Sequence, residues 1–400
     1  MRDHSSGPLE TGGVKEPRGR RALIVTGEDS GDLHGANLIK ACREIDPELG
    51  FFGIGGSRMA EAGCRIILSS AELAVVGAVE VVAHLPSILG AFQLLKMELQ
   101  QQPRPDLLIL IDFPEFNLRV AKMARKQGIP VLYYVSPQVW AWRRYRVKKI
   151  ARLVDRLAVI LPFEAEIYRP HGVRVEYVGN PLMDDFRREC SREEFLGRYG
   201  FDAASPLIGL FPGSRRNELK YMLDTVLAAA GLIARRRPEA QFVLPVAPSL
   251  KEENLAPAVR DCGLPIRMVR DNIYDVAGSC DAVICVSGTA TLQVALAATP
   301  MVILYKLSPL TYWLGRLLVR VPFIGLANIV AGKGVVKELI QDQASPENIA
   351  AEILRFLNDT DYAEGVRKEL MAVRNQMGEG GCSLKVARMA SEMSFGVQKP

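Results

Sequence analysis

The stretch from Arg21 to Ala41 reads RALIVTGEDSGDLHGANLIKA, which is an apolar strand, a loop with glycines and the start of a helix. This order predicts the first βα unit of a nucleotide-binding domain. However, Gly27, Gly31 and Gly35 do not have the G-x-G-x-x-G spacing of a dinucleotide-binding loop. The stretch therefore indicates the fold class more clearly than it indicates a ligand.

The same loop contains the acids Glu28, Asp29 and Asp32 where a phosphate would lie. Carboxylates repel a pyrophosphate by roughly 1–4 kcal/mol per close pair and accept hydrogen bonds from hydroxyl groups. The loop is therefore a better site for a sugar than for a phosphate. A structural role is compatible with this interpretation, because Ser30 or Asp32 could cap the helix from residue 33.

Short apolar runs, each followed by a helical pattern, continue along the chain in two sets. They lie at 22–26, 51–55, 107–112, 131–135, 156–161 and 175–179 in the first half, and at 206–211, 241–246, 265–269, 281–286 and 300–305 in the second. Continuous apolar strands that alternate with helices indicate buried parallel sheets. The predicted fold class is α/β, with two Rossmann-like domains whose parallel sheets face a cleft.

A chain of 400 residues is too long for one ordinary core, so two domains are expected. We predict a disordered tail at 1–20, an N-terminal Rossmann-like domain at 21–185 and a C-terminal one at 186–370. A C-terminal helical segment follows at 371–400, for which crossing back to the first domain is one option.

Composition narrows the class of protein further. The seven cysteines include no C-x-x-C pair and the four histidines are dispersed, so we expect no metal site. The triplet Asp359-Thr360-Asp361 lies far from the glycine loops and is interpreted as a solvated turn. The net charge of +5 suits anionic small substrates or an anionic membrane surface better than nucleic acid. Without a long apolar run or an N-terminal signal, we expect a cytoplasmic protein with no transmembrane helix.

Two loops after strands of the second half are candidates for anion binding. In PGSRRNE, Gly213 allows close backbone approach, and Ser214 and Arg215 can donate to phosphate oxygens. In SGTATLQ, residues 287–293, hydroxyl groups and free backbone N–H groups converge at a helix start. A tight turn and ordinary N-capping are the alternatives. Together the loops favour a nucleoside diphosphate.

Seven motifs in order resemble the lipid-A-disaccharide synthase family (glycosyltransferase family 19), over about residues 21–395. They are GEDSGDLHGA (27–36), DFPEFN (112–117), YVSPQVWAWRRYRVKKI (134–150), LPFE (161–164), PGSRRNE (212–218), SGTATLQ (287–293) and NIVAGKGVVKELIQ (328–341). The resemblance implies a B-type glycosyltransferase fold that needs no cofactor or metal. It also implies inverting transfer of 2,3-diacylglucosamine from its UDP donor to 2,3-diacylglucosamine 1-phosphate (lipid X), which forms a β-1,6 disaccharide and UDP.

The resemblance and the residue types together suggest catalytic roles. The acceptor hydroxyl needs a base and the departing diphosphate needs positive charge. Asp112 is the favoured base, with Glu28 and Asp32 as competitors and a turn-capping role as the structural alternative. Arg215 and the helix start at 288–291 suit the diphosphate.

The remaining expected contacts divide between donor and acceptor. The donor set is Gly213, Ser214, Arg215, Glu218, Ser287, Gly288, Thr289, Thr291, Gln293 and Asn328. The acceptor or sugar set is Glu28, Ser30, Gly31, Asp32, Asn117, Gln138, Trp140 and Arg143. Two positions depart from related patterns: Gln293 replaces a Glu that often binds ribose, and Asn180 replaces a residue that is often His in this family.

Acylated substrates imply work at the anionic inner-membrane surface, with the protein peripherally attached. The basic, aromatic segment 136–152 suits an acceptor phosphate or an anionic leaflet, and part of it is interpreted as a solvated helix. Segment 73–92 is either an amphipathic surface segment or part of the core. Segment 310–326 resembles an interfacial or subunit-contact segment, so a homo-oligomer is possible.

Two alternative functions remain: another UDP-N-acetylglucosamine enzyme of this fold (a peptidoglycan transferase or a 2-epimerase), and a non-catalytic nucleotide-sugar-binding protein.

Overall fold

The computed structural model describes residues 19–73, 85–142, 145–214, 216–247, 250–307, 312 and 322–396; within these ranges the side chains of residues 29, 85, 141–142 and 216–217 are not described. The predicted contacts Arg143 and Arg215 lie outside the described residues. Parts of the segments 73–92 and 310–326 do so as well.

The first sheet contains seven parallel strands in the order β3-β2-β1-β4-β5-β6-β7 among the described residues. Its strands are β1 (Arg21–Val25), β2 (Gly50–Gly55), β3 (Arg65–Ser69), β4 (Leu107–Ile111), β5 (Val131–Tyr134), β6 (Arg156–Val159) and β7 (Arg174–Tyr177). The helices between them are α1 (Asp29–Ile45), α2 (Ser57–Glu61), α4 (Leu85–Gln100), α5 (Pro114–Lys126), α6 (Val139–Trp142), α7 (Arg146–Leu153) and α8 (Glu164–Tyr168), with short turns η1 (Ser70–Glu72) and η2 (Arg169–His171).

The second sheet contains six parallel strands in the order β10-β9-β8-β11-β12-β13 in the described part of the chain. They are β8 (Leu207–Phe211), β9 (Gln241–Pro245), β10 (Ile266–Val269), β11 (Ala282–Val286), β12 (Met301–Tyr305) and β13 (Glu338–Ile340). The surrounding elements are α9 (Pro181–Asp184), α10 (Arg192–Tyr199), α11 (Arg216–Arg236), α12 (Ala256–Asp261), α13 (Ile273–Ser279), α14 (Thr289–Leu296), α16 (Leu326–Ala331), α17 (Pro346–Asn358), α18 (Thr360–Met377), η3 (Glu252–Asn254) and η4 (Gln341–Gln343).

The predicted fold class is confirmed, because both sheets are parallel and alternate with helices. The central strands are mostly apolar and buried, and every residue is buried in LLILI of β4 and LIGLF of β8. Such strands bury both faces, which requires helices on each side. The structure adds the edge strands β3 and β13, which the pattern of apolar runs did not predict.

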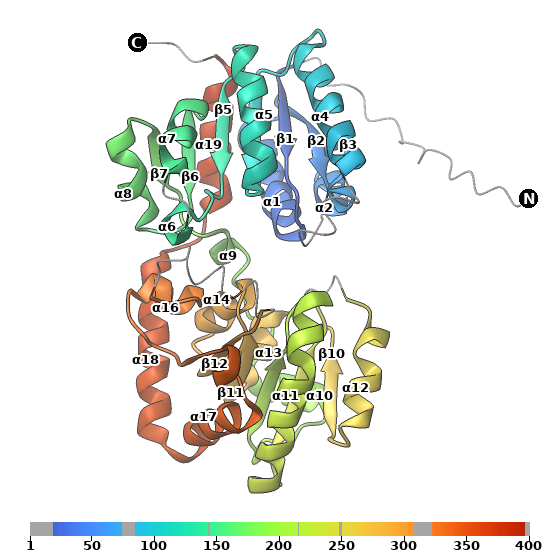
Figure 1. Cartoon of the computed structure of the whole chain (residues 1–400), viewed down its shortest axis with the longest axis vertical. Helices are drawn as coiled ribbons and strands as arrows, with labels where there is room; N and C mark the ends of the chain where they lie inside the picture. The colour runs from blue at the N-terminus through green and yellow to red at the C-terminus, as the bar shows by residue number, and fades with distance from the viewer. Residues whose placement is uncertain are drawn as a thin grey trace, which may run out of the picture.

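The two sheets form separate lobes, with α9 between them and the last helix, α19 (Cys382–Ser394), returning to the first lobe (Figure 1). Val386, Ala387 and Met389 of α19 share a buried cluster with α1 and with one face of the first sheet. The chain therefore crosses between the lobes twice, once before α9 and once after α18.

Asp184 joins the two crossings. Its carboxylate accepts the backbone N–H groups of Gly381, Cys382 and Ser383 at 2.6, 2.9 and 2.8 Å, and so caps the start of α19. Nearby, Tyr177 Oη donates to the carbonyl of Met377 at 3.0 Å.

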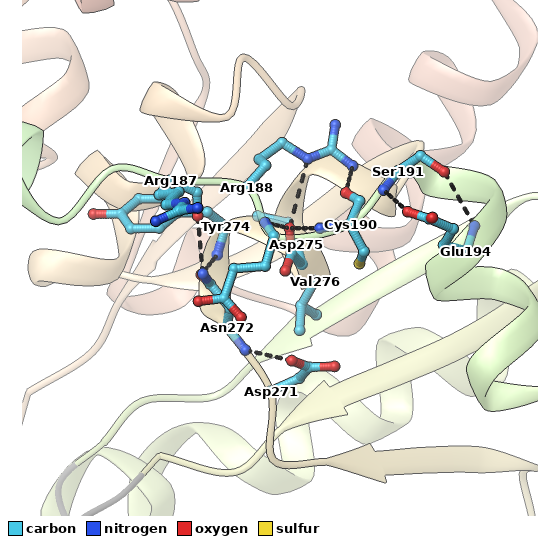
Figure 2. A network of polar contacts seen from close by, with 12 residues as sticks. Arg187, Arg188, Cys190, Ser191, Glu194, Asp271, Asn272, Tyr274, Asp275 and Val276 are labelled. Carbon is cyan, nitrogen blue, oxygen red and sulfur yellow. Dashed lines mark hydrogen bonds and ion pairs between the residues drawn. The ribbon is translucent and has the colours of Figure 1, made fainter.

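Past α9, the chain is held to the second lobe by polar contacts (Figure 2). The fully buried Asp275 accepts the backbone N–H groups of Glu189 and Cys190 at 2.9 and 3.3 Å. Asn272 Nδ2 donates to the carbonyl of Arg187 at 2.9 Å. This part of the connection therefore belongs structurally to the second lobe.

Candidate functional site

The turn after β4 presents Asp112 in an uncommon backbone conformation. Asp112 and Phe113 have φ angles of 45° and 47°, in the left-handed region that non-glycine residues rarely adopt. Such residues cost about 1–3 kcal/mol each and persist only where the surroundings impose them. Gly27 gives this turn its space, since a Cβ atom there would lie 2.4 Å from the Phe113 ring.

Two buried side chains hold the turn in this conformation. Asn117 Nδ2 donates to the carbonyl oxygens of Ile111 and Asp112 at 3.1 and 2.7 Å. Tyr133 Oη donates to the same Asp112 carbonyl at 2.6 Å. Burial raises the pKa of Tyr133 well above its usual range, so its hydroxyl keeps the proton that it donates. The backbone of Asp112 is thereby held at the end of β4.

A cavity of about 300 Å³ opens at the carboxyl ends of the first sheet's strands. Glu28 follows β1, Asp112 follows β4 and Glu164 follows β6, and all three line this cavity. The other lining residues are Pro114, Val135, Ser136, Pro137, Gln138, Ile160 and Leu161. Val135 also has a positive φ, 60°, which is costly for a β-branched residue. A cavity lined by three carboxyl groups suits hydroxyl groups and repels phosphate.

Glu164 is the functional candidate that sequence reasoning missed. Its side chain is 1 % exposed. Its carboxylate accepts Trp140 Nε1 at 3.1 Å and the backbone N–H groups of Ile160 and Leu161 at 3.2 and 3.0 Å. Burial raises the pKa of Glu164 to about 7, and these donors oppose that rise. The available signal was its place in LPFE, directly after a strand of the first sheet.

The structure gives several predicted acceptor contacts structural roles. Asp32 is 3 % exposed and accepts the backbone N–H groups of Gly56, Arg58 and Met59, at the start of α2. The expectation that Ser30 or Asp32 caps the first helix is therefore wrong, because α1 begins at Asp29 without a side-chain cap. Asn117 is fully buried under the Asp112 turn, and Trp140 is bonded to Glu164.

The rest of the acceptor set lies closer to the cavity surface. Glu28 and Gln138 line the cavity, and Ser30 is half-buried in the first turn of α1. Gly31 is buried beside Thr26. Asn180, the departure from the family pattern, accepts Leu182 N–H at 3.0 Å and caps α9. It also donates to the carbonyl of Ile160 at 3.4 Å, which links α9 to the wall of the cavity.

The second sheet presents the loop after β8. Gly213 has a φ of 114°, and a Cβ atom there would lie 2.7 Å from Cβ of Glu218. Glu218 accepts the backbone N–H of Ser214 at 2.9 Å. Glu218 therefore shapes this loop from the first turn of α11.

The loop after β11 ends at the start of α14, where the structure shows no side-chain cap. Ser287 is half-buried, Gly288 and Thr289 are exposed, and Gln293 lies one turn further on. Thr291 is buried and donates to the carbonyl of Gly288 at 2.8 Å. A helix start of this kind has backbone N–H groups available to an anion.

Asn328 lies away from the exposed loop surfaces. It is 1 % exposed, and its side chain bonds Val335, Val336 and Glu338. These contacts hold the chain between α16 and β13. The structure therefore gives Asn328 a role in shaping the loop.

Two features that would indicate another class of site are absent from the described residues. These residues contain no group of three or more His, Cys, Asp or Glu side chains placed to hold a metal ion. Within the same residues, no helix is both long enough and apolar enough to span a bilayer.

Comparison with solved structures finds the same fold in other proteins. A UDP-GlcNAc 2-epimerase from Neisseria meningitidis, bound to UDP-GlcNAc, matches with a TM-score of 0.61 and 12% identity, over 93% of this chain and 100% of that one. The calicheamicin glycosyltransferase CalG4 matches with a TM-score of 0.60 and 15% identity, over 96% and 100%. At these identities the likeness shows the fold alone, which is the two-lobed fold of B-type glycosyltransferases.

Sequence comparison is more specific. The family model described as "Lipid-A-disaccharide synthetase" matches residues 22–390. The lipid-A-disaccharide synthase of Syntrophotalea carbinolica is 56% identical over 380 residues, which are 95% of this chain and 96% of that protein. Since the family model and a close relative both cover nearly the whole sequence, the chain belongs to the lipid-A-disaccharide synthase family.

Proposed function

We propose that the two lobes divide the reaction between them, with the first lobe binding the acceptor and the second binding the UDP-sugar donor. As a member of its family, the chain is a hexosyltransferase of lipid A biosynthesis. The reaction joins 2,3-diacylglucosamine, donated from UDP, to 2,3-diacylglucosamine 1-phosphate and releases UDP. The chemistry of the two lobes supports this division. The first lobe has a cavity lined by carboxyl groups, and the second has glycine-containing loops and a helix start.

Asp112 is the proposed base for the attacking hydroxyl group of the acceptor. Inverting transfer is a single displacement, so the hydroxyl must lose its proton as it attacks the anomeric carbon. Asp112 lines the cavity, and the bonds from Asn117 and Tyr133 fix its backbone. A rigidly held base reduces the reorganisation that proton transfer would otherwise require. Glu28 is the competing carboxylate in the same cavity.

The departing diphosphate is proposed to lie between the loop after β8 and the start of α14. Gly213 and Ser214 supply backbone close to the ligand, and the N–H groups at the start of α14 favour negative charge. Arg215 follows directly in the sequence and would add a forked donor. Because UDP leaves as a stabilised anion, no general acid is required.

The lipid chains of both substrates favour work at the surface of a membrane. Each buried methylene group contributes about 0.8 kcal/mol toward remaining in lipid. Leu89 and Met97 of α4 are 54% and 62% exposed, and they offer apolar side chains on the first lobe. We infer that the protein binds the cytoplasmic face of the inner membrane peripherally, with the acceptor lobe toward the lipid.

The test of the proposed base is Asp112→Asn. Purified protein is incubated with the diacylated donor and acceptor, and the disaccharide is measured by mass spectrometry. We expect turnover to fall by roughly 10²–10⁴-fold, the usual contribution of a general base. UDP affinity, measured by calorimetry, should stay within about twofold. Near-normal turnover would remove Asp112 as the base.

Arg215→Ala is the complementary variant. It should weaken UDP binding, whereas Asp112→Asn should not. If both variants leave UDP affinity unchanged while Glu28→Gln weakens it, the proposed division between the lobes is wrong.

A further inference from the structure

Glu164 connects three segments that border the acceptor cavity. Trp140 belongs to α6, Ile160 and Leu161 follow β6, and Glu164 itself begins α8. All three partners donate an N–H to the one carboxylate, at distances between 3.0 and 3.2 Å. The indole of Trp140 also packs edge-on against Phe163, with ring centroids 5.3 Å apart. The carboxylate is therefore the shared acceptor of one wall of the cavity.

An ionised carboxylate accepts all three donors most strongly, because both of its oxygens share the negative charge. In the described part of the chain, the hydrogen-bond partners of Glu164 are N–H groups of neutral residues, so hydrogen bonds stabilise its charge. On protonation, one oxygen becomes a hydroxyl group with reduced capacity to accept. One of the three N–H groups then loses a good acceptor, and the wall loses part of its support.

The charged and titratable groups around Glu164 are few among the described residues. Tyr168 of α8 and Tyr177 of β7 face it; burial raises the pKa of Tyr168 well above its usual range and the pKa of Tyr177 to about 12. Asp112 and Glu28 share the cavity. The tyrosines stay neutral near pH 7, and burial raises the pKa of Glu164 to about 7. Near pH 7, Glu164 therefore changes its charge while the two neighbouring tyrosines remain neutral.

We propose that Glu164 is a positioning residue for the transfer reaction, whose ionised carboxylate holds Trp140 and the turn at 160–161 in the arrangement that lets the acceptor reach Asp112. This inference rests on the proposed acceptor role of the cavity. It assigns to Glu164 no contact with the reacting atoms. It predicts that the arrangement of the cavity wall, and with it turnover, depends on pH through this residue.

The first experiment measures turnover and the acceptor KM from pH 5.5 to 9 for the wild type, Glu164→Gln and the control Glu166→Gln. Glu166 is exposed on the same helix. At pH 8, Glu164→Gln should lower kcat by about tenfold, the order expected for losing one hydrogen bond to a charged group. UDP affinity should be unchanged. Wild-type turnover should decline below pH 7, and this decline should be absent or displaced in Glu164→Gln but preserved in Glu166→Gln.

A second readout needs no substrate and so separates this proposal from the proposed function. In the background Trp142→Phe, Trp313→Phe, Trp140 is the single tryptophan of the chain. Its fluorescence should titrate with a midpoint near pH 7, and Glu164→Gln should abolish the transition. If the protein forms no disaccharide yet Trp140 titrates as described, the function fails and the ionisation of the cavity wall stands.

Trp140→Phe keeps Glu164 and its bonds from the backbone N–H groups of Ile160 and Leu161 but removes the indole donor. It therefore tests the contact between Trp140 and Glu164 even if Glu164→Gln fails to fold. It should lower turnover without changing UDP affinity, and in the double variant its effect should not add to that of Glu164→Gln. Wild-type turnover in Glu164→Gln at pH 8, or an unaltered pH profile, would overturn the proposal. Additive effects of the two substitutions would overturn it as well.

Discussion

Individual residues at the carboxyl ends of the first sheet's strands show where sequence reasoning succeeds and where it stops. Asp112 was predictable because an acid directly after a buried strand lies at the ligand edge of a parallel sheet. The left-handed backbone at Phe113 and Val135 was not predictable, since both are residue types that disfavour positive φ. Glu164 was missed because its importance comes from burial and from Trp140, 24 positions earlier.

Asn117 provides the residue-scale prediction. Its amide is fully buried and donates to the Ile111 and Asp112 carbonyls, so Asn117→Ala removes one donor from each and leaves the Asp112 carbonyl with the bond from Tyr133. We expect a loss of roughly 1–3 kcal/mol in the free energy of unfolding, measured by urea denaturation. Turnover should fall by about tenfold or more, because the Asp112 turn can relax, while UDP affinity is retained.

The control is Asn375→Ala, at an exposed position on α18, which should alter neither quantity beyond about 0.5 kcal/mol. A destabilised Asn117→Ala protein with normal turnover at low temperature would mean that the turn conformation does not matter for catalysis.

At the scale of helices and strands, the predictable elements are those with continuous apolar runs. The edge strands β3 and β13 were missed for a physical reason: β3 is only partly buried, and β13 has three residues. An edge strand pairs on one side only and can have less apolar sequence, so the pattern predicted the edge strands β7 and β10 but not these two. The start of α1 was misjudged because Asp32 serves α2, an element that is distant in sequence and adjacent in space.

Asp184 provides the element-scale prediction. It accepts three backbone N–H groups at the start of α19, whereas Asp359 caps α18 by accepting the backbone N–H of Tyr362. Asp184→Ala should therefore lower the free energy of unfolding by about 2–3 kcal/mol, and Asp359→Ala by about 1 kcal/mol. Urea denaturation of the two variants measures the difference. Equal losses would mean that the contact between α9 and α19 adds nothing to ordinary helix capping.

At the scale of the whole molecule, the last helix, α19, does not belong to the lobe that precedes it in sequence. The helix α19 follows the second lobe in sequence but packs on α1 of the first lobe (Figure 1). The sequence did not determine whether this helix crosses back, because the apolar face of a terminal helix does not indicate which core it packs against. With α9 and α19 both tied by Asp184, the two crossings between the lobes lie together.

Met389 of α19 provides the prediction at this scale. It is 2 % exposed within the cluster that joins α19 to α1 and the first sheet. Met389→Ala removes buried apolar volume and should destabilise the protein by about 2–5 kcal/mol. Met371→Ala, at a position on α18 that is 39% exposed, is the matched control and should be nearly neutral.

The sheet that loses stability in Met389→Ala shows which lobe α19 stabilises. If α19 completes the first lobe, amide hydrogen exchange in Met389→Ala should accelerate in β1 and β4 and remain slow in β8 and β11. The reason is that local opening follows the core that has lost its packing. Exchange that accelerates mainly in β8 and β11 would assign α19 energetically to the second lobe, against its contacts. Equal acceleration in both sheets would mean that the lobes unfold as one cooperative unit, and the two crossings would then have to transmit stability between them.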